Sequence, residues 1–416
     1  MLCLNMLVPR LIKRQFIVSF ALFIATTALL YSKFGYYNFA AYKPRPAFWD
    51  LNNHTYWWNC YKTVGLDVFL STSSLLDACR NFNYGYFSMF SMGLTTSIYG
   101  NVMFWGLLQV LVFLFLVVKV YFHKLFTSRE YVYLLALFSP GVFLLYLSGN
   151  MDIQIICLLL LANKLIFSGK EKFGLTLIFI TALLKFYTAP VLLVAFFIVK
   201  VKSSRTYCIM LIFSAATLIL FQLIKTPLAP FPDSAQNKFG SGIFDNYARK
   251  AGLPLNKFQG ELLGLIFLCA VILLIIVCYK KLTPLNKNNQ IKLSKSKQML
   301  SFNFLMMAAT SLACYLGGLN VDYRLTFIAL TGIALLQIPQ TKVKIISAIF
   351  PYVWIFSLWI AYPFANLQKY IGLDLQPLGD IFLVGTMAYI IFQSFFVFKY
   401  LVKKDSTAIK SYKFRF

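Results

Sequence analysis

The sequence has few of the residues that bind metal ions or carry out acid–base chemistry. Only 13 of its 416 residues are Asp or Glu, and its only histidines are His54 and His123. None of its eight cysteines belongs to a CxxC pair. Because structural zinc sites depend on such spacings, we expect no metal site. The scarcity of carboxylates also makes any segment where several of them gather a candidate for chemistry.

Charged residues of both signs make up only 12% of the chain, whereas 60% of it is hydrophobic and the mean hydropathy is +0.72. A water-soluble core cannot hide so much apolar surface in a chain of 416 residues, which excludes a soluble globular protein. The formal net charge of +26 comes from Lys and Arg in short clusters between apolar runs. A nucleic-acid-binding protein would instead gather these residues on one face. The composition therefore predicts an all-α polytopic membrane protein with no nucleic-acid partner.

The apolar runs predict about twelve transmembrane helices. The first follows the basic sequence RLIKR and ends at about Leu30, and we expect an uncleaved signal anchor because no clear small-residue cleavage site follows it. Several others are shorter than the roughly 20 residues of a perpendicular span, so 173–186 and 189–201 could be bent or re-entrant. The runs after the first are 101–121, 131–147, 151–167, 173–186, 189–201, 207–224, 259–279, 300–316, 324–338, 346–361 and 379–400.

The distribution of charge predicts which side of the membrane each loop faces. Segments that the alternation of spans places inside hold 26 of the 39 Lys and Arg residues, but among the carboxylates only Glu130, Glu171 and Asp405. Cytoplasmic loops carry such an excess of basic residues. We therefore expect a multi-pass protein with both termini cytoplasmic and any active site extracytoplasmic. We expect the membrane to be the bacterial inner (plasma) membrane, with an endoplasmic membrane as the alternative.

We expect residues 1–416 to form a single integral membrane domain. The polar segments divide it into a first extracytoplasmic loop at 32–100 and a second long one at 225–258. A basic cytoplasmic linker at 280–298 and a basic cytoplasmic tail at 401–416 complete the expected organisation. The asymmetry predicts that the chemistry faces away from the cytoplasm, where an energised sugar would most simply be carried by a lipid.

The first outer loop contains the main candidate for a catalytic residue. Asp50 follows Phe48 and Trp49, where an aromatic belt would mark the outer membrane boundary. A carboxylate there loses part of its hydration, which makes it a stronger base toward a sugar hydroxyl. A solvated loop aspartate, or an N-cap for the segment LNNHTYWW, explains the same residue without any chemistry.

The sequence LLDACRNFNYGY, later in this loop, offers a rival base and candidate binding groups. Asp77 and Arg80 are three residues apart and could share a helix face. Asn83 and Tyr84 combine an amide with an aromatic ring, which suits the edge and the face of a sugar. The alternative is an interfacial helix end followed by a turn at Gly85.

Cys60 and Cys79 are the two cysteines that fall in an outer loop. The oxidising side of a membrane permits a disulfide there. We therefore predict a bond between Cys60 and Cys79, which would stabilise the fold by about 3 kcal/mol through the entropy of the unfolded chain.

Polar residues at the outer ends of later spans are further candidates for substrate binding. Asn150 and Asp152, in SGNMDIQ, either project into an outer cavity or cap the helix that follows. Lys185 lies in an apolar hairpin, where it either snorkels to the interface or binds a lipid phosphate. Arg324 follows Asp322 at the start of a span and either engages two phosphate oxygens with its planar fork or pairs locally with Asp322.

These features, taken in chain order, resemble the membrane glycosyltransferases of the GT-C superfold. The sequence has a first span, a large outer loop with an early Asp, GN.D at the start of a later span, and LKFYTAPVLL about 35 residues further on. GLDVF at 65–69 and NFNYGY at 81–86 are similar to segments of glycosyltransferase family 87, which uses polyprenyl-phosphate mannose. The likeness covers roughly residues 10–200. The loop reads NYGYF, whereas that family more often has a proline after the tyrosine.

The resemblance implies a GT-C-like helical bundle with short interfacial helices in the first outer loop. It implies transfer of a mannose-like hexose from a polyprenyl-phosphate donor to a lipid-linked or glycan acceptor, with inversion and without a bound nucleotide or other cofactor. Asp50 matches the early Asp and would be the base, with Asp77 as its rival. Asn150, Asp152 and Lys185 match the GN.D and K..P positions.

The donor phosphate is expected to bind Lys185, Arg324 or Arg80. The expected partners are membrane lipid, the lipid-linked sugar donor and a glycan or glycolipid acceptor.

Two other classes of function stay open. A transporter or flippase of lipid-linked sugars would need polar residues within several spans, of which we note only Gln154, Asn163 and Lys164. A polysaccharide polymerase or ligase of another membrane family would rely on basic residues in a large late loop such as 225–258.

Overall fold

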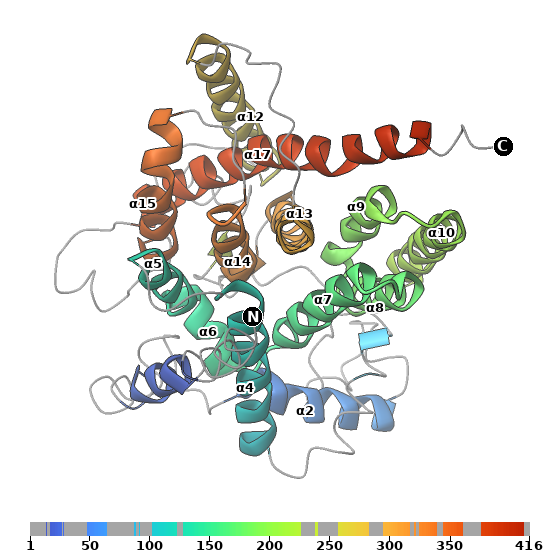
Figure 1. Ribbon diagram of the computed structural model, residues 1–416. Coiled ribbons are helices and arrows are strands. Elements are labelled where there is room, and N and C mark those ends of the chain that lie inside the picture. Colours follow the sequence, from blue (N-terminus) through green and yellow to red (C-terminus); the bar gives the residue numbers. More distant parts are fainter. Residues whose placement is uncertain are drawn as a thin grey trace. The chain divides into compact units, whose positions relative to one another are not determined.

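The structure is a computed structural model. The part of the chain that the structure describes is almost entirely helical (Figure 1). The strands in this part of the chain are two residues long: β1 (Lys238–Phe239) pairs antiparallel with β2 (Asn320–Val321). The described residues are 14, 17–26, 28, 48–64, 87–88, 91, 102–122, 128–225, 238–239, 257–282, 294–316, 320–321, 324–338, 344–360 and 376–411.

The chain divides into two compact units. The first, which we call the Asp50 unit, consists of Pro44–Leu116 and Leu145–Gln236. The second, which we call the Arg324 unit, consists of Met1–Lys43, Val117–Leu144 and Asn237–Phe416.

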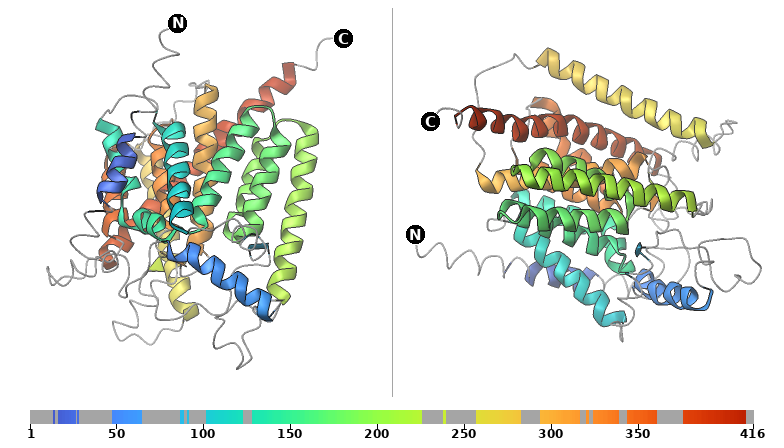
Figure 2. Two further views of the ribbon diagram at one scale, coloured as in Figure 1. Left: turned by 90° about the horizontal axis from the view of Figure 1, so that it is seen from below. Right: turned by 90° about the vertical axis from the view of Figure 1, so that its right-hand side faces the viewer.

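In the Asp50 unit, α7 and α8 pack side by side and α10 packs against α8 and α9 (Figure 2). The helix α2 lies across the ends of these helices rather than alongside them, as both views in Figure 2 show. The unit contains α2 (Trp49–Val64), α7 (Asp152–Phe167), α8 (Glu171–Leu184), the 3-10 turn η3 (Phe186–Thr188), α9 (Pro190–Ile198) and α10 (Lys202–Lys225), with most of α4 (Val102–Tyr121) and the end of α6 (Pro140–Ser148).

Two glycines let the chain turn from α7 into α8 and pack the two helices closely. Gly169 has a φ of 83°, a left-handed conformation that glycine adopts without steric cost and that commonly ends a helix. A Cβ at Gly174 would lie 2.7 Å from the backbone oxygen of Ala162 in α7, so glycine permits this approach of α8. The antiparallel pair therefore returns the chain to the end of the unit where α7 began.

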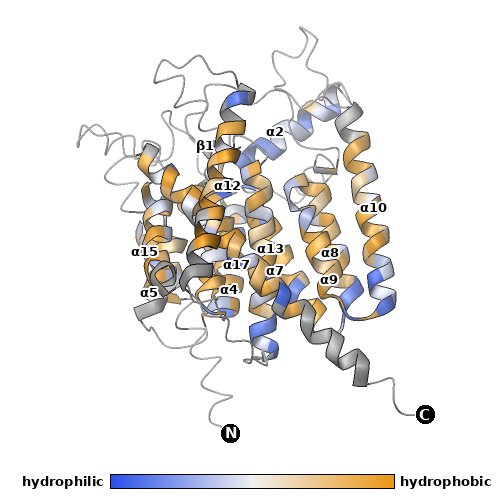
Figure 3. Cartoon of the chain, turned by 90° about the horizontal axis from the view of Figure 1, so that it is seen from above, coloured by the Kyte–Doolittle hydropathy of each residue, from blue (hydrophilic) through white to orange (hydrophobic). Residues whose placement is uncertain are grey.

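The opposite end of the Asp50 unit is basic. There the carboxylate of Glu171 accepts hydrogen bonds from the backbone N–H groups of Lys200 (3.2 Å) and Val201 (3.3 Å), which joins the start of α8 to the turn between α9 and α10. Figure 3 shows hydrophilic residues at this end of α10 and along α2 at the other end. The basic residues at this end are Lys164, Lys170, Lys172, Lys200, Lys202 and Arg205.

In the Arg324 unit, Trp354 is one of the largest side chains of the buried core. Its fully buried ring lies against Gly332, where a Cβ would approach the ring to 2.1 Å. Its Nε1–H donates to the backbone oxygen of Ile328 (3.3 Å), and the ring of Phe350 lies nearly parallel to it at 6.2 Å. The helices of this unit are α5 (Ser128–Leu137), α12 (Lys257–Leu282), α13 (Lys295–Leu316), α14 (Leu325–Leu335), α15 (Lys344–Ile360) and α17 (Gln376–Ser411), with the rest of α4 and α6.

The helices confirm a membrane protein, whereas the predicted number of spans is not confirmed. Among the described residues, four helices are long and apolar enough to cross a membrane, or five if one bent pair forms a single span. That pair is Tyr131–Leu137 of α5 and Pro140–Ser148 of α6, which together cover the predicted span 131–147 and meet at an angle of 52°. The bend lies just before Pro140, which lacks a backbone N–H and restricts the residue before it. Other apolar helices here are 10–17 residues long.

The apolar helices also bury more polar groups than the sequence analysis noted. Asn303 on α13 and Asp380 and Gln393 on α17 are each at least 97% buried within the Arg324 unit. Their helices α13 and α17 pack against each other. The expectation that only Gln154, Asn163 and Lys164 lie as polar residues within the spans was therefore wrong, because the three residues of this unit are also buried there, each alone in a long apolar run.

Candidate functional site

Phe48 fixes where α2 begins. Its φ of 55° places it in the left-handed region, and its N–H donates to the backbone oxygen of Leu147 at the end of α6 (2.7 Å). Its buried ring fills the space beside Gly106, where a Cβ would lie 2.3 Å from the ring, and beside Gly149. These contacts hold the first turn of α2 next to the turn that leads into α7.

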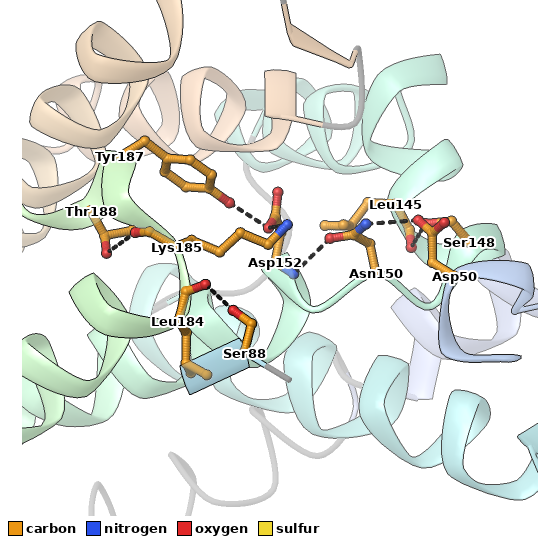
Figure 4. A network of polar contacts seen from close by, with 10 residues as sticks. All are labelled: Asp50, Ser88, Leu145, Ser148, Asn150, Asp152, Leu184, Lys185, Tyr187 and Thr188. Carbon is orange, nitrogen blue, oxygen red and sulfur yellow. Dashed lines mark hydrogen bonds and ion pairs between the residues drawn. The ribbon is translucent and has the colours of Figure 1, made fainter. Parts of the chain in front are cut away.

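As a result, Asp50 in the first turn of α2 meets Asn150, which is 100 residues away in the sequence. The side-chain amide of Asn150 donates from Nδ2 to Oδ2 of Asp50 (2.7 Å). Its Oδ1 accepts from the backbone N–H of Asp152 at the start of α7 (3.0 Å), which defines how the amide is turned. Figure 4 shows Asn150 between Asp152 and Asp50. The buried amide therefore both supports the N-terminus of α7 and orients the partly buried carboxylate of Asp50.

Next to this pair, Lys185 and Asp152 form a buried ion pair. Lys185 Nζ lies 3.1 Å from Asp152 Oδ1, and the two side chains are 3% and 1% exposed. Lys185 reaches it because α8 ends at Leu184 and the backbone of Lys185 is extended, with φ −144° and ψ 112°. The hydroxyl of Tyr187 donates to the same carboxylate oxygen. Figure 4 shows both side chains pointing toward Asp152.

His54 is a further member of this region that the sequence analysis did not propose as a site residue. It lies four residues after Asp50 on α2 and is 5% exposed. Burial, together with the positive charge of Lys185, lowers the pKa of His54 from 6.5 to about 3, so the imidazole is neutral at physiological pH. Within the described part of the chain, its Nδ1 has no hydrogen-bond partner.

The structure therefore brings together four of the predicted site residues, Asp50, Asn150, Asp152 and Lys185. Arg324 is buried at the start of α14 in the Arg324 unit. The remaining predicted residues, Asp77, Arg80, Asn83, Tyr84 and Asp322, lie outside the described residues. Cys60 is disulfide-bonded, and its predicted partner Cys79 also lies outside them.

Sequence reasoning missed His54 and Tyr187, and of the two only His54 carried a usable signal. The spacing of His54 from Asp50 places both on one face of a helix, once α2 is recognised as helical. Tyr187 lies two residues after Lys185, but its contact with Asp152 depends on the break in the helix at Lys185. No sequence motif predicts this break. Among the described residues, no three His, Cys, Asp or Glu side chains come close enough together to hold a metal ion.

The arrangement provides an oriented carboxylate, a neutral imidazole and a charge-balanced ion pair at one end of an apolar helical unit. An oriented carboxylate can accept a proton, and a neutral imidazole can accept or donate a hydrogen bond. No protein family, curated protein or solved structure matches the chain.

Proposed function

We propose that the protein is a membrane glycosyltransferase that transfers a mannose-like hexose from a polyprenyl-phosphate donor to a lipid-linked or glycan acceptor, with inversion. The observation that supports this proposal is the contact of 2.7 Å between Asp50 and Asn150, beside the ion pair of Asp152 and Lys185. These are the residues that match the GT-C motifs, and they come from segments far apart in the sequence. Their place at the end of an apolar unit suits a substrate held at a membrane surface.

In the proposed reaction, Asp50 is the general base. Its carboxylate takes the proton from an acceptor hydroxyl while the hydroxyl oxygen forms a bond to the anomeric carbon of the hexose. The bond from that carbon to the phosphate oxygen breaks, and polyprenyl phosphate leaves with the electron pair. Attack opposite the leaving phosphate inverts the anomeric carbon. Asn150 orients the base through its bond to Oδ2, and a positioned base contributes about 10²–10⁴-fold to such a step.

The basic groups proposed for the donor phosphate differ in their surroundings. Lys185 already pairs with Asp152, so a phosphate near it would share the ammonium with that carboxylate. This makes Lys185 a group that can both hold Asp152 in place and add positive charge near a leaving phosphate. Arg80 is the alternative phosphate-binding residue in the Asp50 unit.

The test is transfer of radiolabelled mannose from polyprenyl-phosphate mannose by the purified full-length protein in detergent. Asp50→Asn should lower the rate about 10²–10⁴-fold, because the amide cannot accept the proton. Asn53→Ala, on an exposed position of the same helix, is the matched control and should keep the wild-type rate. Circular dichroism verifies that both variants are folded. Undiminished transfer by Asp50→Asn would move the base to Asp77, and no transfer by the wild type would refute the proposal.

A second candidate, a transporter of lipid-linked sugars, gains some support from the buried Asn303, Asp380 and Gln393 in the Arg324 unit. Polar residues within membrane helices often mark a substrate pathway. The same labelled donor in sealed vesicles separates the two activities. A transporter would move the intact lipid-linked sugar across the membrane without cleaving its phosphate bond, whereas the proposed enzyme releases polyprenyl phosphate.

A further inference from the structure

We infer that His54 binds a hydroxyl group of the acceptor sugar, next to the hydroxyl that Asp50 deprotonates. This inference rests on the proposed function and deepens it, because it assigns part of the acceptor site to α2. His54 would therefore touch the substrate and affect the use of the acceptor rather than the use of the lipid-linked donor.

The position of His54 on α2 suits this role. Residues four apart lie on the same side of a helix, one turn from each other, with a rise of about 6 Å along its axis. His54 and Asp50 have this spacing, and both are at least partly buried. His54 is also close enough to Lys185 for the ammonium charge to act on its ring. The imidazole therefore lies on the helix that carries Asp50, within electrostatic range of Lys185, which itself pairs with Asp152.

The burial of His54 points to a ligand. Its side chain is 5% exposed, and in the part of the chain that the structure describes its Nδ1 meets no hydrogen-bond partner. A buried nitrogen without a partner is unfavourable, so such groups in native proteins call for an explanation. A hydroxyl of a bound sugar would supply the missing hydrogen bond.

The charge state of His54 gives it a different role from that of Asp50. Burial and the charge of Lys185 lower the pKa of the imidazole to about 3, so the ring is a weak base at neutral pH. It can take part in a hydrogen bond with a hydroxyl without removing the proton. Of these two groups on one helix face, Asp50 would remove the proton from the reacting hydroxyl, and His54 would form a hydrogen bond with the neighbouring hydroxyl of the same sugar ring.

The experiment compares His54→Leu, His54→Asn and the control Asn53→Ala in the full-length protein. Methyl α-mannoside serves as a soluble acceptor and radiolabelled polyprenyl-phosphate mannose as the donor. His54→Leu should raise the KM for the acceptor about tenfold, the value of one neutral hydrogen bond, with the KM for the donor unchanged. His54→Asn, which keeps hydrogen-bonding groups, should recover part of the loss.

A second measurement does not depend on turnover. Titration of methyl α-mannoside in the absence of donor, followed by tryptophan fluorescence to which Trp57 and Trp58 of α2 contribute, should give a Kd that rises about tenfold in His54→Leu. An unchanged Kd and acceptor KM, a rise in the donor KM alone, or no binding by the wild type would overturn the inference. Asp50→Asn is measured in parallel. If its transfer rate equals that of the wild type while His54→Leu weakens mannoside binding, the proposed base fails but the sugar contact stands.

Discussion

Removing one partner of the buried ion pair between Lys185 and Asp152 should destabilise the protein far more than removing a surface charge. At the separation of 3.1 Å, Coulomb's law with an effective dielectric constant of about 20 gives an attraction of about 5 kcal/mol. Both groups also lose their hydration in the fold. Lys185→Met or Asp152→Asn leaves the other charge buried without its counter-charge, which costs about 3–5 kcal/mol in the free energy of unfolding.

The double substitution tests whether this loss comes from the pair. When both charges are removed, no uncompensated charge is left, so the double variant should be more stable than the sum of the single losses predicts, by about 2–3 kcal/mol. Tyr187 can still donate to the amide oxygen left at position 152. Unfolding by SDS in mixed detergent micelles, followed by circular dichroism, gives the free energies. Lys62→Met, at an exposed position over the ring of Trp58, is the control and should change stability by less than about 0.5 kcal/mol.

Strict additivity of the two single losses would refute the reasoning, because it would mean that the charges do not interact. Single losses no larger than that of Lys62→Met would refute it as well. They would show that water or lipid headgroups compensate each charge when its partner is gone.

Three further predictions follow from other contacts. Gly332→Ala should lower the free energy of unfolding by about 1–3 kcal/mol, because the added Cβ would collide with the ring of Trp354. Gly385→Ala should raise it by up to about 1 kcal/mol through helix propensity, because no atom lies within 4 Å of the added Cβ. SDS unfolding of both variants checks that the two changes have opposite signs. Since the folded-state pKa of His54 is about 3 and the unfolded value is 6.5, only the unfolded state gains this proton as the pH falls from 6.5 toward 3. The wild type should lose about 1.4 kcal/mol per pH unit there, and His54→Leu should remove that share of the loss, which SDS titrations at several pH values measure. Because Cys60 is disulfide-bonded, reduction of the denatured protein should increase the number of reactive thiols, and an unchanged number would contradict this bond.

Hydropathy predicted most of the helices well, because lipid forces the backbone to satisfy its own hydrogen bonds and long apolar runs therefore become helical. The prediction of 101–121 as a helix agrees with α4, and that of 151–167 agrees with α7. It did not predict the break before Pro140, because the run 131–147 stays apolar throughout and only the backbone geometry of proline interrupts it. It also did not predict that the basic tail from 401 begins as a continuation of α17 to Ser411.

The site was predictable residue by residue, but not as an arrangement. Motif likeness selected Asp50, Asn150, Asp152 and Lys185. Their contacts depend on features without a local sequence signal, above all the left-handed backbone of Phe48 and its fit against a glycine of another helix. The pairing of Lys185 with Asp152, rather than with a lipid phosphate alone, likewise follows from where α8 ends. Contacts between residues so far apart in the sequence are determined by packing, and a local sequence pattern does not predict them.

The side-chain amide of Asn150 is hydrogen-bonded both to the N-terminus of α7 and to Asp50, which makes the site sensitive to deamidation. Hydrolysis of that amide to an acid during storage would exchange an N–H donor for a second carboxylate at hydrogen-bond distance from Asp50. Two carboxylates that close cannot both stay ionised, so one of them would retain a proton. An old preparation could then keep its fold and its mass to within a dalton, and yet lose the base on which the proposed transfer depends.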